Sequence, residues 1–343
     1  MTFRSSRRQA VALALAALAS TSAWSQTVTL RLHQLLPAQA PVPAKAIIPW
    51  AQKVEKDSGG RIKIQLFHAM QLGGAPPSLF DQAKDGVVDI TWTVLGYTPG
   101  RFPKAEVFEL PFISGASEPS SRAFHEFVEK HAADEFKDVK LIAVHTHGPG
   151  LFHTKRPVNG LEDLRGMKVR GGSRIINNML TQLGATPVGM PVPAVTEALS
   201  KGVIDGATIP WEVVPALKVH ELVKNHTTFA GNRGLYTQTF AFSMNKASYE
   251  KLPADLKKVI DDNSGVETAA LFGRAMEEGD KAGRAAAEGA KNNIVALDVA
   301  ETQRWLRTAG SVESDWVAEV GKKGIDGKKL AAEARALVAK YNK

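Results

Sequence analysis

Several short motifs in this sequence hold residue types that could do chemistry. Ser248-Tyr-Glu-Lys251 has the spacing of a serine–lysine nucleophile, but the Ser-Asp-Asn and Lys-Thr-Gly triplets that accompany it are absent. His125-Glu126 is followed by Glu129, where a zinc-protease helix needs a second histidine. There is also no cysteine, which excludes a thiolate zinc site, an iron–sulfur cluster and a cysteine nucleophile. We therefore expect a protein that is not an enzyme.

Three histidines could form a metal site. His145 and His147 could place two imidazoles on one face of a strand end, and His153 follows six residues further on. No carboxylate lies at a helpful spacing, so we expect these side chains to line a cleft or to be hydrogen-bonded. We expect no metal and no other cofactor.

The N-terminus has the pattern of a secretory signal peptide. Three arginines lie in the first eight positions, followed by the apolar run Val11–Ala19 and by Ala23-Trp-Ser25. The run is too short to span a bilayer, and it lacks the 3.6-residue period of an amphipathic helix. The sequence predicts that residues 1–25 are a signal peptide cleaved after Ser25, and that the mature protein is periplasmic.

Charge and composition limit the partners. The net charge of +8 includes the three arginines of the predicted signal peptide. The other basic residues are spread thinly, and their only clusters are short lysine pairs, which are typical of solvated helix faces. We therefore expect no nucleic-acid partner, and a modest positive field that favours small anions. A monomer is expected.

The elements that must position a site follow an alternating order. Thr27–His33 alternates like a strand, a helix ends at Gly59-Gly60, and a strand, a helix and a strand follow at Arg61–Phe67, Ser78–Lys84 and Asp89–Val94. This order predicts an α/β fold with a mostly parallel sheet. Further strands are predicted at Lys140–His145, Lys168–Arg170, Gly206–Ile209 and Thr237–Met244, and helix is predicted from Pro253 almost to the end.

Longer stretches resemble the solute-binding proteins of TRAP transporters of the DctP type, in the family's order, over roughly residues 28 to 340. In the first half they are Gly59-Gly-Arg-Ile-Lys-Ile-Gln-Leu-Phe67, Gln71-Leu-Gly-Gly74, Asp85-Gly-Val-Val-Asp-Ile90, Gly96-Tyr-Thr-Pro-Gly-Arg-Phe-Pro103 and Glu109-Leu-Pro-Phe112. In the second half they are Leu161-Glu-Asp-Leu-Arg-Gly-Met-Lys-Val-Arg170, Leu183-Gly-Ala-Thr-Pro-Val188, Glu197-Ala-Leu-Ser-Lys-Gly-Val-Ile-Asp-Gly206 and Ser243-Met-Asn-Lys246.

The resemblance implies the two-lobed periplasmic binding protein fold, with crossing strands, a long helix that braces both lobes, and a ligand cleft between them. By analogy one lobe holds residues 26–147 plus 236–275, and the other holds 148–235 plus 276–343 with the C-terminal helices. The implied function is capture of an organic acid and its delivery to the small and large membrane subunits of a permease driven by an ion gradient.

The family's ligand contact is an arginine that ends the Lys-Val-Arg strand, which here is Arg170. A planar guanidinium can hold a carboxylate through two parallel charge-assisted hydrogen bonds. Gly171-Gly172-Ser173 follow at a predicted helix start, where backbone amides could supplement the anion site.

Two departures from better known members concern the ligand. Sugar-acid binders carry a second arginine where this chain has Gly150, and an asparagine where it has Ile209. Keto-acid members place a glutamate and a tryptophan around a sodium ion, and Thr208 and Ile209 occupy those places. The resemblance therefore implies fewer polar contacts and no metal.

The residues near the site predict an apolar pocket. We expect a monocarboxylate with an apolar or aromatic body, held by Arg170. Its predicted wall is Ile209, Val192, Leu151, Phe152 and Trp211, although Trp211 could equally be a core residue. From the first lobe, the polar residues at strand ends that could close over the ligand are His33, Gln34, Thr93 and Tyr97.

Two other functions remain open on the sequence. One is an accessory that presents its ligand to a membrane sensor rather than to a permease. The other is a periplasmic enzyme that acts on small acids, which would need a placed acid/base pair that the sequence does not reveal.

Overall fold

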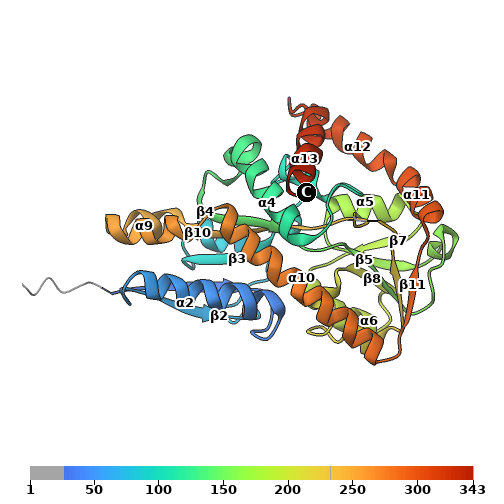
Figure 1. Ribbon diagram of the computed structural model, residues 1–343, viewed down its shortest axis with the longest axis horizontal. Helices are drawn as coiled ribbons and strands as arrows, with labels where there is room; N and C mark the ends of the chain where they lie inside the picture. Colours follow the sequence, from blue (N-terminus) through green and yellow to red (C-terminus); the bar gives the residue numbers. More distant parts are fainter. Residues whose placement is uncertain (1–26, 232, 343) are drawn as a thin grey trace, which may run out of the picture.

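The computed structural model describes residues 27–231 and 233–342, and it contains two β-sheets in two adjoining lobes (Figure 1). The strand order is β2-β1-β3-β10-β4 in the first sheet and β11-β9-β5-β8-β6-β7 in the second. We call each sheet, with the helices packed on it, the first and the second lobe. The predicted signal peptide lies outside the described residues.

Each sheet is parallel except for one strand. In the first sheet β10 is antiparallel to both β3 and β4, and in the second β5 is antiparallel to both β8 and β9. The strands of the first sheet are β1 (Val28–Gln34), β2 (Ile62–Phe67), β3 (Ile90–Val94), β4 (Val139–Thr146) and β10 (Thr239–Asn245). Those of the second are β5 (Leu151–Thr154), β6 (Lys168–Gly171), β7 (Thr186–Gly189), β8 (Gly206–Ile209), β9 (Asn225–Thr228) and β11 (Asn293–Ala296).

The two reversed strands are also the places where the chain passes between the lobes. β4 of the first sheet leads into β5 of the second, and β9 of the second sheet precedes β10 of the first. This confirms the expected α/β fold with crossing strands. The segments between β4 and β5 and between β9 and β10 lie at the boundary between the lobes. They can therefore line a cavity between the two lobes.

Helices cover both faces of the first sheet, with α2 on one side and α4 on the other (Figure 1). Trp50 of α2 packs edge-on against Phe242 of β10, with ring centroids 4.7 Å apart. α2 ends at Asp57 because Gly59 and Gly60 adopt φ angles of +61° and +79°, which residues with a Cβ rarely take. The helices of this lobe are α2 (Ile48–Asp57), α3 (Leu79–Lys84), α4 (Ser117–Phe127), α8 (Lys246–Glu250) and α9 (Ala254–Asp262).

The second sheet carries α5 (Arg174–Gln182), α6 (Val195–Ser200) and α7 (Val219–Leu222). α5 begins directly after β6, and the Ser173 hydroxyl caps it by accepting the backbone N–H of Ile176 at 3.3 Å. The helix start predicted at 171–173 is therefore confirmed. Among the described residues, no helix combines the length and apolar character that a membrane span requires.

The long helix α10 (Val266–Gly289) runs diagonally from one lobe to the other (Figure 1). It packs against α4 and β4 in the first lobe and against the turn Trp211–Val213 (η9) in the second. Three glycines of α10, Gly273, Gly279 and Gly283, allow these close approaches. A Cβ at Gly273 would lie 2.5 Å from the Glu118 Cα, and one at Gly283 would lie 1.9 Å from the Trp211 carbonyl oxygen.

The C-terminal part differs from the sequence prediction by one strand. β11 interrupts the expected continuous helix because Asn293–Ala296 pairs in parallel with β9. The helices α11 (Val299–Thr308) and α12 (Gly310–Gly321) then lead to α13 (Gly327–Tyr341), which packs on α4 of the first lobe. The chain crosses between the sheets from β4 to β5 and from β9 to β10, and the division of the lobes at 147/148 and 235/236 stays a prediction.

Candidate functional site

A small cavity of about 30 Å³ lies where the two lobes, the crossing strands and α10 meet. Most of its lining is apolar or aromatic, and a few polar side chains reach it. The lining residues are Leu35, Leu36, Trp92, Val94, Tyr97, His147, Arg170, Val192, Ile209, Pro210, Glu212, Val213, Gln238, Phe240 and Met276.

Arg170 of β6 is a buried cation with unused hydrogen-bonding capacity. Its Nε donates to the carbonyl oxygen of Met190 at 2.9 Å, and its Nη1 donates to that of Thr208 at 3.1 Å. Its Nη2 has no hydrogen-bond partner among the described residues, and none of their salt bridges involves Arg170. Because an uncompensated buried charge is costly, this guanidinium is a site for an anion.

Two further polar side chains near Arg170 carry unused polar atoms. The Tyr236 hydroxyl and the Gln238 Nε2 are buried and have no partner among the described residues. Burial raises the pKa of Tyr236, against the opposing effect of the positive charge of Arg170, so the hydroxyl keeps its proton. Arg170 and Gln238 line the cavity and can donate to a bound carboxylate, and the Tyr236 hydroxyl is a further donor close enough to Arg170 to feel its charge.

His147 contributes a neutral ring to the cavity wall. Its Nδ1 donates to the Gly148 carbonyl oxygen at 2.5 Å, and its Nε2 accepts the backbone N–H of Gln238 at 3.0 Å. Burial is the main cause that lowers its pKa to about 3, and the charge of Arg170 adds to this effect. The imidazole therefore adds no charge that competes with Arg170 for an anion.

The other two histidines singled out in the sequence have structural partners. His145 accepts the indole N–H of Trp92 at 2.8 Å through Nε2, and the two rings lie parallel. The Nδ1 atoms of His153 and His226 are 2.7 Å apart. The three predicted histidines therefore do not converge on one point, and the described part of the chain has no cluster of three metal-ligating side chains.

Aromatic rings form one wall of the cavity. Trp92 of β3 and Phe240 of β10 lie on adjacent strands, and their rings stack with centroids 5.3 Å apart and an interplanar angle of 5°. The hydrogen bond from Trp92 to His145 fixes the indole in this orientation. A flat, rigid apolar surface of this kind suits a planar ligand body.

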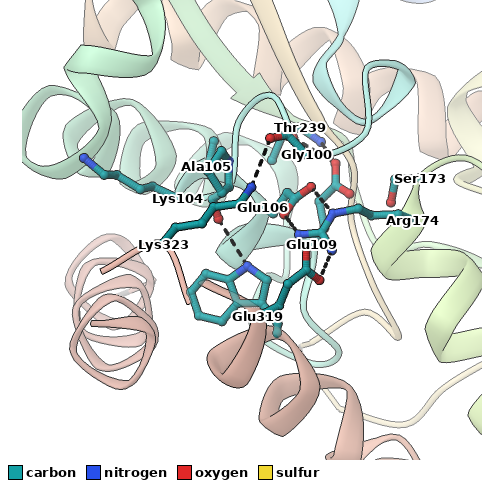
Figure 2. A network of polar contacts seen from close by, with 12 residues as sticks. Gly100, Lys104, Ala105, Glu106, Glu109, Ser173, Arg174, Thr239, Glu319 and Lys323 are labelled. Atoms are coloured by element: carbon teal, nitrogen blue, oxygen red, sulfur yellow. Dashed lines mark hydrogen bonds and ion pairs between the residues drawn. The ribbon is translucent and has the colours of Figure 1, made fainter. Parts of the chain in front are cut away.

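Contacts across the boundary hold the two lobes together around the cavity. Tyr97 of the first lobe accepts the backbone N–H of Val192 of the second at 2.8 Å. Arg174, at the start of α5, forms ion pairs with Glu106 of the turn Ala105–Glu109 and with Glu319 of α12, as Figure 2 shows. The lobes are therefore in contact on both sides of this boundary.

Glu109 lies beside this network and is buried (Figure 2). Its Oε1 accepts the backbone N–H of Thr239 at 3.0 Å and the Thr239 hydroxyl at 2.8 Å. Burial raises its pKa to about 7. Glu109 thus ties the first-lobe turn to the crossing strand β10.

Four of the predicted site residues, Arg170, Ile209, Val192 and Tyr97, line the cavity together. Thr208 lies directly behind Arg170, since its carbonyl oxygen accepts from the guanidinium and its hydroxyl donates to the Arg170 carbonyl oxygen at 2.9 Å. Thr208 therefore orients the arginine from the adjacent strand.

Gly150 acts by leaving space. A Cβ at this position would lie 2.2 Å from Cε1 of Tyr236, so any side chain here would displace the tyrosine ring. Where the resemblance places a second arginine, this chain instead admits Tyr236, whose hydroxyl is one of the unused donors.

The remaining predicted residues lie outside the cavity lining. Phe152 packs in the second-lobe core, with its ring centroid 5.5 Å from that of Trp305, and Trp211 packs edge-on against His153 at 5.0 Å. Leu151 and Trp211 line a separate, wider groove, and Ser173 caps α5.

The three polar residues predicted from the first sheet also lie elsewhere. His33 is 2.7 Å from Gln82 Oε1, and Gln34 is bonded to the backbone of Leu36 at 2.5 Å, so both stabilise loops. Thr93 is buried in β3 opposite Ala241.

Sequence reasoning missed the contribution of β10 and α10 to the cavity. Gln238 and Phe240 lie on or next to β10, and Met276 lies on α10, far along the chain from Arg170. Among the missed residues, His147 had a sequence signal, since it was a histidine expected to line a cleft. Trp92 could have been found from its place two residues before Val94 on a predicted strand.

Comparison with known proteins places this geometry in context. The profile of the DctP family, described as bacterial extracellular solute-binding protein, family 7, matches residues 33–318. A TRAP solute binding protein from Rhodoferax ferrireducens T118, solved with copurified benzoate, is 52% identical, with a TM-score of 0.91 and 92% of this chain and 99% of that chain covered.

Two further solved structures are also similar. A marine metagenome TRAP solute binding protein in complex with 3-hydroxybenzoate is 48% identical, with a TM-score of 0.91 and 93% of this chain and 100% of that chain covered. One from Bordetella bronchiseptica with bound (R)- and (S)-mandelate is 33% identical, with a TM-score of 0.84 and 91% and 99% covered.

Proposed function

This chain belongs to the DctP family of bacterial extracellular solute-binding proteins, and from that premise we propose that it captures an aromatic monocarboxylate in the cavity between its lobes. The observation that carries the proposal is Arg170, a buried guanidinium whose Nη2 has no partner among the described residues. A bound carboxylate neutralises this charge and accepts from its unused N–H groups.

The rest of the cavity supports an apolar ligand body. Beyond the donors around Arg170 and the carboxyl group of Glu212, the walls are formed mainly by Trp92, Phe240, Val94 and Ile209, which offer the several hydroxyls of a sugar no partner. Polar ligand groups buried against such walls lose their hydrogen bonds to water without replacement. The benzoate, 3-hydroxybenzoate and mandelate bound by the similar proteins agree with this ligand class.

Binding requires the lobes to separate, because the space left between them is small and the lobes touch across it. We propose that the crossing strands and α10 act as the hinge, and that the bonds from Tyr97 and Arg174 to the opposite side re-form on closure. The ligand then lies where water is excluded, which strengthens the interaction between its carboxylate and Arg170.

We also propose the cellular setting that the family implies. The ligand-loaded protein delivers its cargo to the small and large membrane subunits of a TRAP permease driven by an ion gradient, and it has no catalytic role. Residues 1–25 act as an export signal, so the periplasmic protein begins at Gln26. We also propose that it is a monomer. The intact mass of the exported protein tests the cleavage site.

Isothermal titration calorimetry tests the proposed ligand class. Benzoate, 3-hydroxybenzoate and mandelate should bind, whereas succinate and glucuronate should not. Arg170→Lys should weaken benzoate binding by at least about 10-fold, because a lysine keeps the charge but loses the planar two-pronged contact. The control Arg165→Lys changes an exposed arginine of the same lobe and should bind like wild type.

Two results contradict the proposal. Binding of glucuronate or succinate in preference to the aromatic acids rejects the apolar cavity as the ligand site. Retention of full benzoate affinity in Arg170→Lys shows that the carboxylate is held elsewhere.

A further inference from the structure

A buried carboxyl group lines the same cavity as Arg170. Glu212 lies in the turn Trp211–Val213 that follows β8, and the residue is 3% exposed. Its Oε1 has no hydrogen-bond partner among the described residues. A buried polar atom without a partner is rare in folded proteins, and one that faces a ligand cavity is available to a ligand.

The fold makes specific room for this side chain. A Cβ at Gly279 of α10 would lie 2.7 Å from the Glu212 Cγ, so a residue larger than glycine there would displace the glutamate. The backbone N–H of Glu212 donates to Asp280 Oδ1 at 2.8 Å, which anchors the turn to α10. Glu212 is therefore held on the α10 side of the cavity.

Arg170 and Glu212 reach the cavity from different elements: Arg170 lies on β6, and Glu212 lies in the turn after β8, against α10. The positive charge of Arg170 opposes the rise in the pKa of Tyr97 and Tyr236 that burial causes. The pKa of Glu212 is raised to about 8, first by burial and then by the neighbouring Asp280 carboxylate. The two groups form no salt bridge, and the walls near Glu212 include Met276 of α10.

We propose that Glu212 is a second polar contact for the ligand and selects aromatic monocarboxylates that carry a hydroxyl group on the ring, away from the carboxylate. This proposal rests on the proposed function, since it takes the Arg170 end of the cavity as the carboxylate site. The ring hydroxyl donates its hydrogen to Glu212 Oε1, which gives that buried oxygen the partner it lacks.

A neutral hydroxyl suits this end of the cavity better than a second anionic group. Glu212 accepts a hydrogen bond whether it is ionised or protonated, because the protonated form keeps a carbonyl oxygen. A second carboxylate on the ring would lie beside Glu212 and the Asp280 carboxylate, and like charges brought together repel. The cavity should therefore discriminate against aromatic dicarboxylates.

Calorimetric titration of benzoate, 3-hydroxybenzoate, 4-hydroxybenzoate and isophthalate into the full protein tests the proposal. Wild type should prefer one of the two hydroxybenzoates over benzoate by about 10-fold or more, and should not bind isophthalate. In Glu212→Met, which keeps the length and removes the acceptor, this preference should disappear.

Two further variants make the result specific. Glu212→Gln retains an acceptor oxygen and should restore most of the preference for the hydroxybenzoate. Glu221→Gln changes an exposed glutamate of the same lobe and should leave the preference of wild type unchanged. Thermal melts of each variant show whether the fold is intact.

The possible results separate this inference from the proposed function. If Glu212→Met keeps the preference, or if wild type binds isophthalate, the inference is overturned while aromatic-acid binding stands. If wild type binds neither benzoate nor a hydroxybenzoate, the proposed function fails and this inference fails with it.

Discussion

At the scale of single residues, the candidate site depends on polar atoms that the protein leaves without partners. Arg170 is held by two carbonyl oxygens, which fix the guanidinium plane without neutralising its charge. Tyr236 fits beside it only because residue 150 is glycine. The cost of burying these unused groups is recovered when a carboxylate accepts from them.

Replacing Tyr236 by phenylalanine should separate binding from stability. The hydroxyl has no partner among the described residues, so its removal should leave the melting temperature unchanged or slightly raised. Affinity for benzoate should fall about 10-fold, since a hydrogen bond to a charged acceptor is lost. Calorimetry and thermal melts measure the two effects.

The matched control is Tyr249→Phe, which removes an exposed hydroxyl that donates to Asp261 at 2.8 Å. It should not alter the affinity for benzoate. A Tyr236→Phe protein that binds as tightly as wild type would show that this hydroxyl does not contact the carboxylate.

At the scale of elements, α10 and the crossing strands determine how the cavity is enclosed. β10 brings Phe240 to the aromatic wall, and α10 brings Met276 and presses against the turn that holds Glu212. A glycine inside a helix costs about 1 kcal/mol relative to alanine. The helix carries this cost at Gly279 and Gly283 because the turn approaches so closely.

The substitution Gly283→Ala should therefore destabilise the protein although alanine favours helix. Its Cβ would lie 1.9 Å from the carbonyl oxygen and 2.6 Å from the carbonyl carbon of Trp211, and backbone atoms cannot rotate away. Overpacking of this kind typically costs about 1–3 kcal/mol. The melting temperature should fall by several degrees.

Gly289→Ala provides the control on the same helix, because nothing lies within 4 Å of a Cβ at Gly289. Its melting temperature should equal or slightly exceed that of wild type. Equal melting temperatures for the two alanine variants would mean that α10 can move away from the turn.

At the scale of the whole molecule, buried titratable groups determine how stability varies with pH. Burial raises the pKa of Glu109 to about 7 and that of Glu212 to about 8. From the ordinary value of 4.5 upward the native state holds protons that the unfolded state has released. The stability these groups contribute is therefore full below about pH 4.5 and is lost as the pH rises to about 8.

The buried histidines act in the opposite direction. Burial lowers the pKa of His145 and His147 from 6.5 to about 3, so the unfolded state takes up protons that the native state does not. Their contribution is full above pH 6.5 and is lost as the pH falls toward 3.

Together these groups predict a melting temperature that is highest between about pH 4.5 and 6.5 and falls on both sides. Thermal melts from pH 4 to 9 measure this profile. Glu109→Gln should reduce the loss on the alkaline side, whereas Glu221→Gln should not. A melting temperature that rises steadily through pH 7 and 8 contradicts the prediction.

The sequence by itself determined the features that depend on local pattern and residue type. Local pattern predicted β1, β2, β3, β4, β6, β8 and β10, whereas the prediction of Arg170 as a carboxylate contact came from the resemblance to the solute-binding family. Strands of four residues carry little periodic signal, and β5, β7, β9 and β11 were missed although the equally short β6 and β8 were predicted.

Only the tertiary structure decided which residues surround Arg170. Tyr236 packs beside Gly150. Gln238 and Phe240 reach the cavity from the crossing that contains β10. Glu212 is hydrogen-bonded to Asp280, which lies 68 residues further along the chain. These contacts join segments far apart in sequence, so no local spacing records them. They follow from how sheets, crossings and α10 pack, and that packing also determines which buried polar atoms remain without a partner.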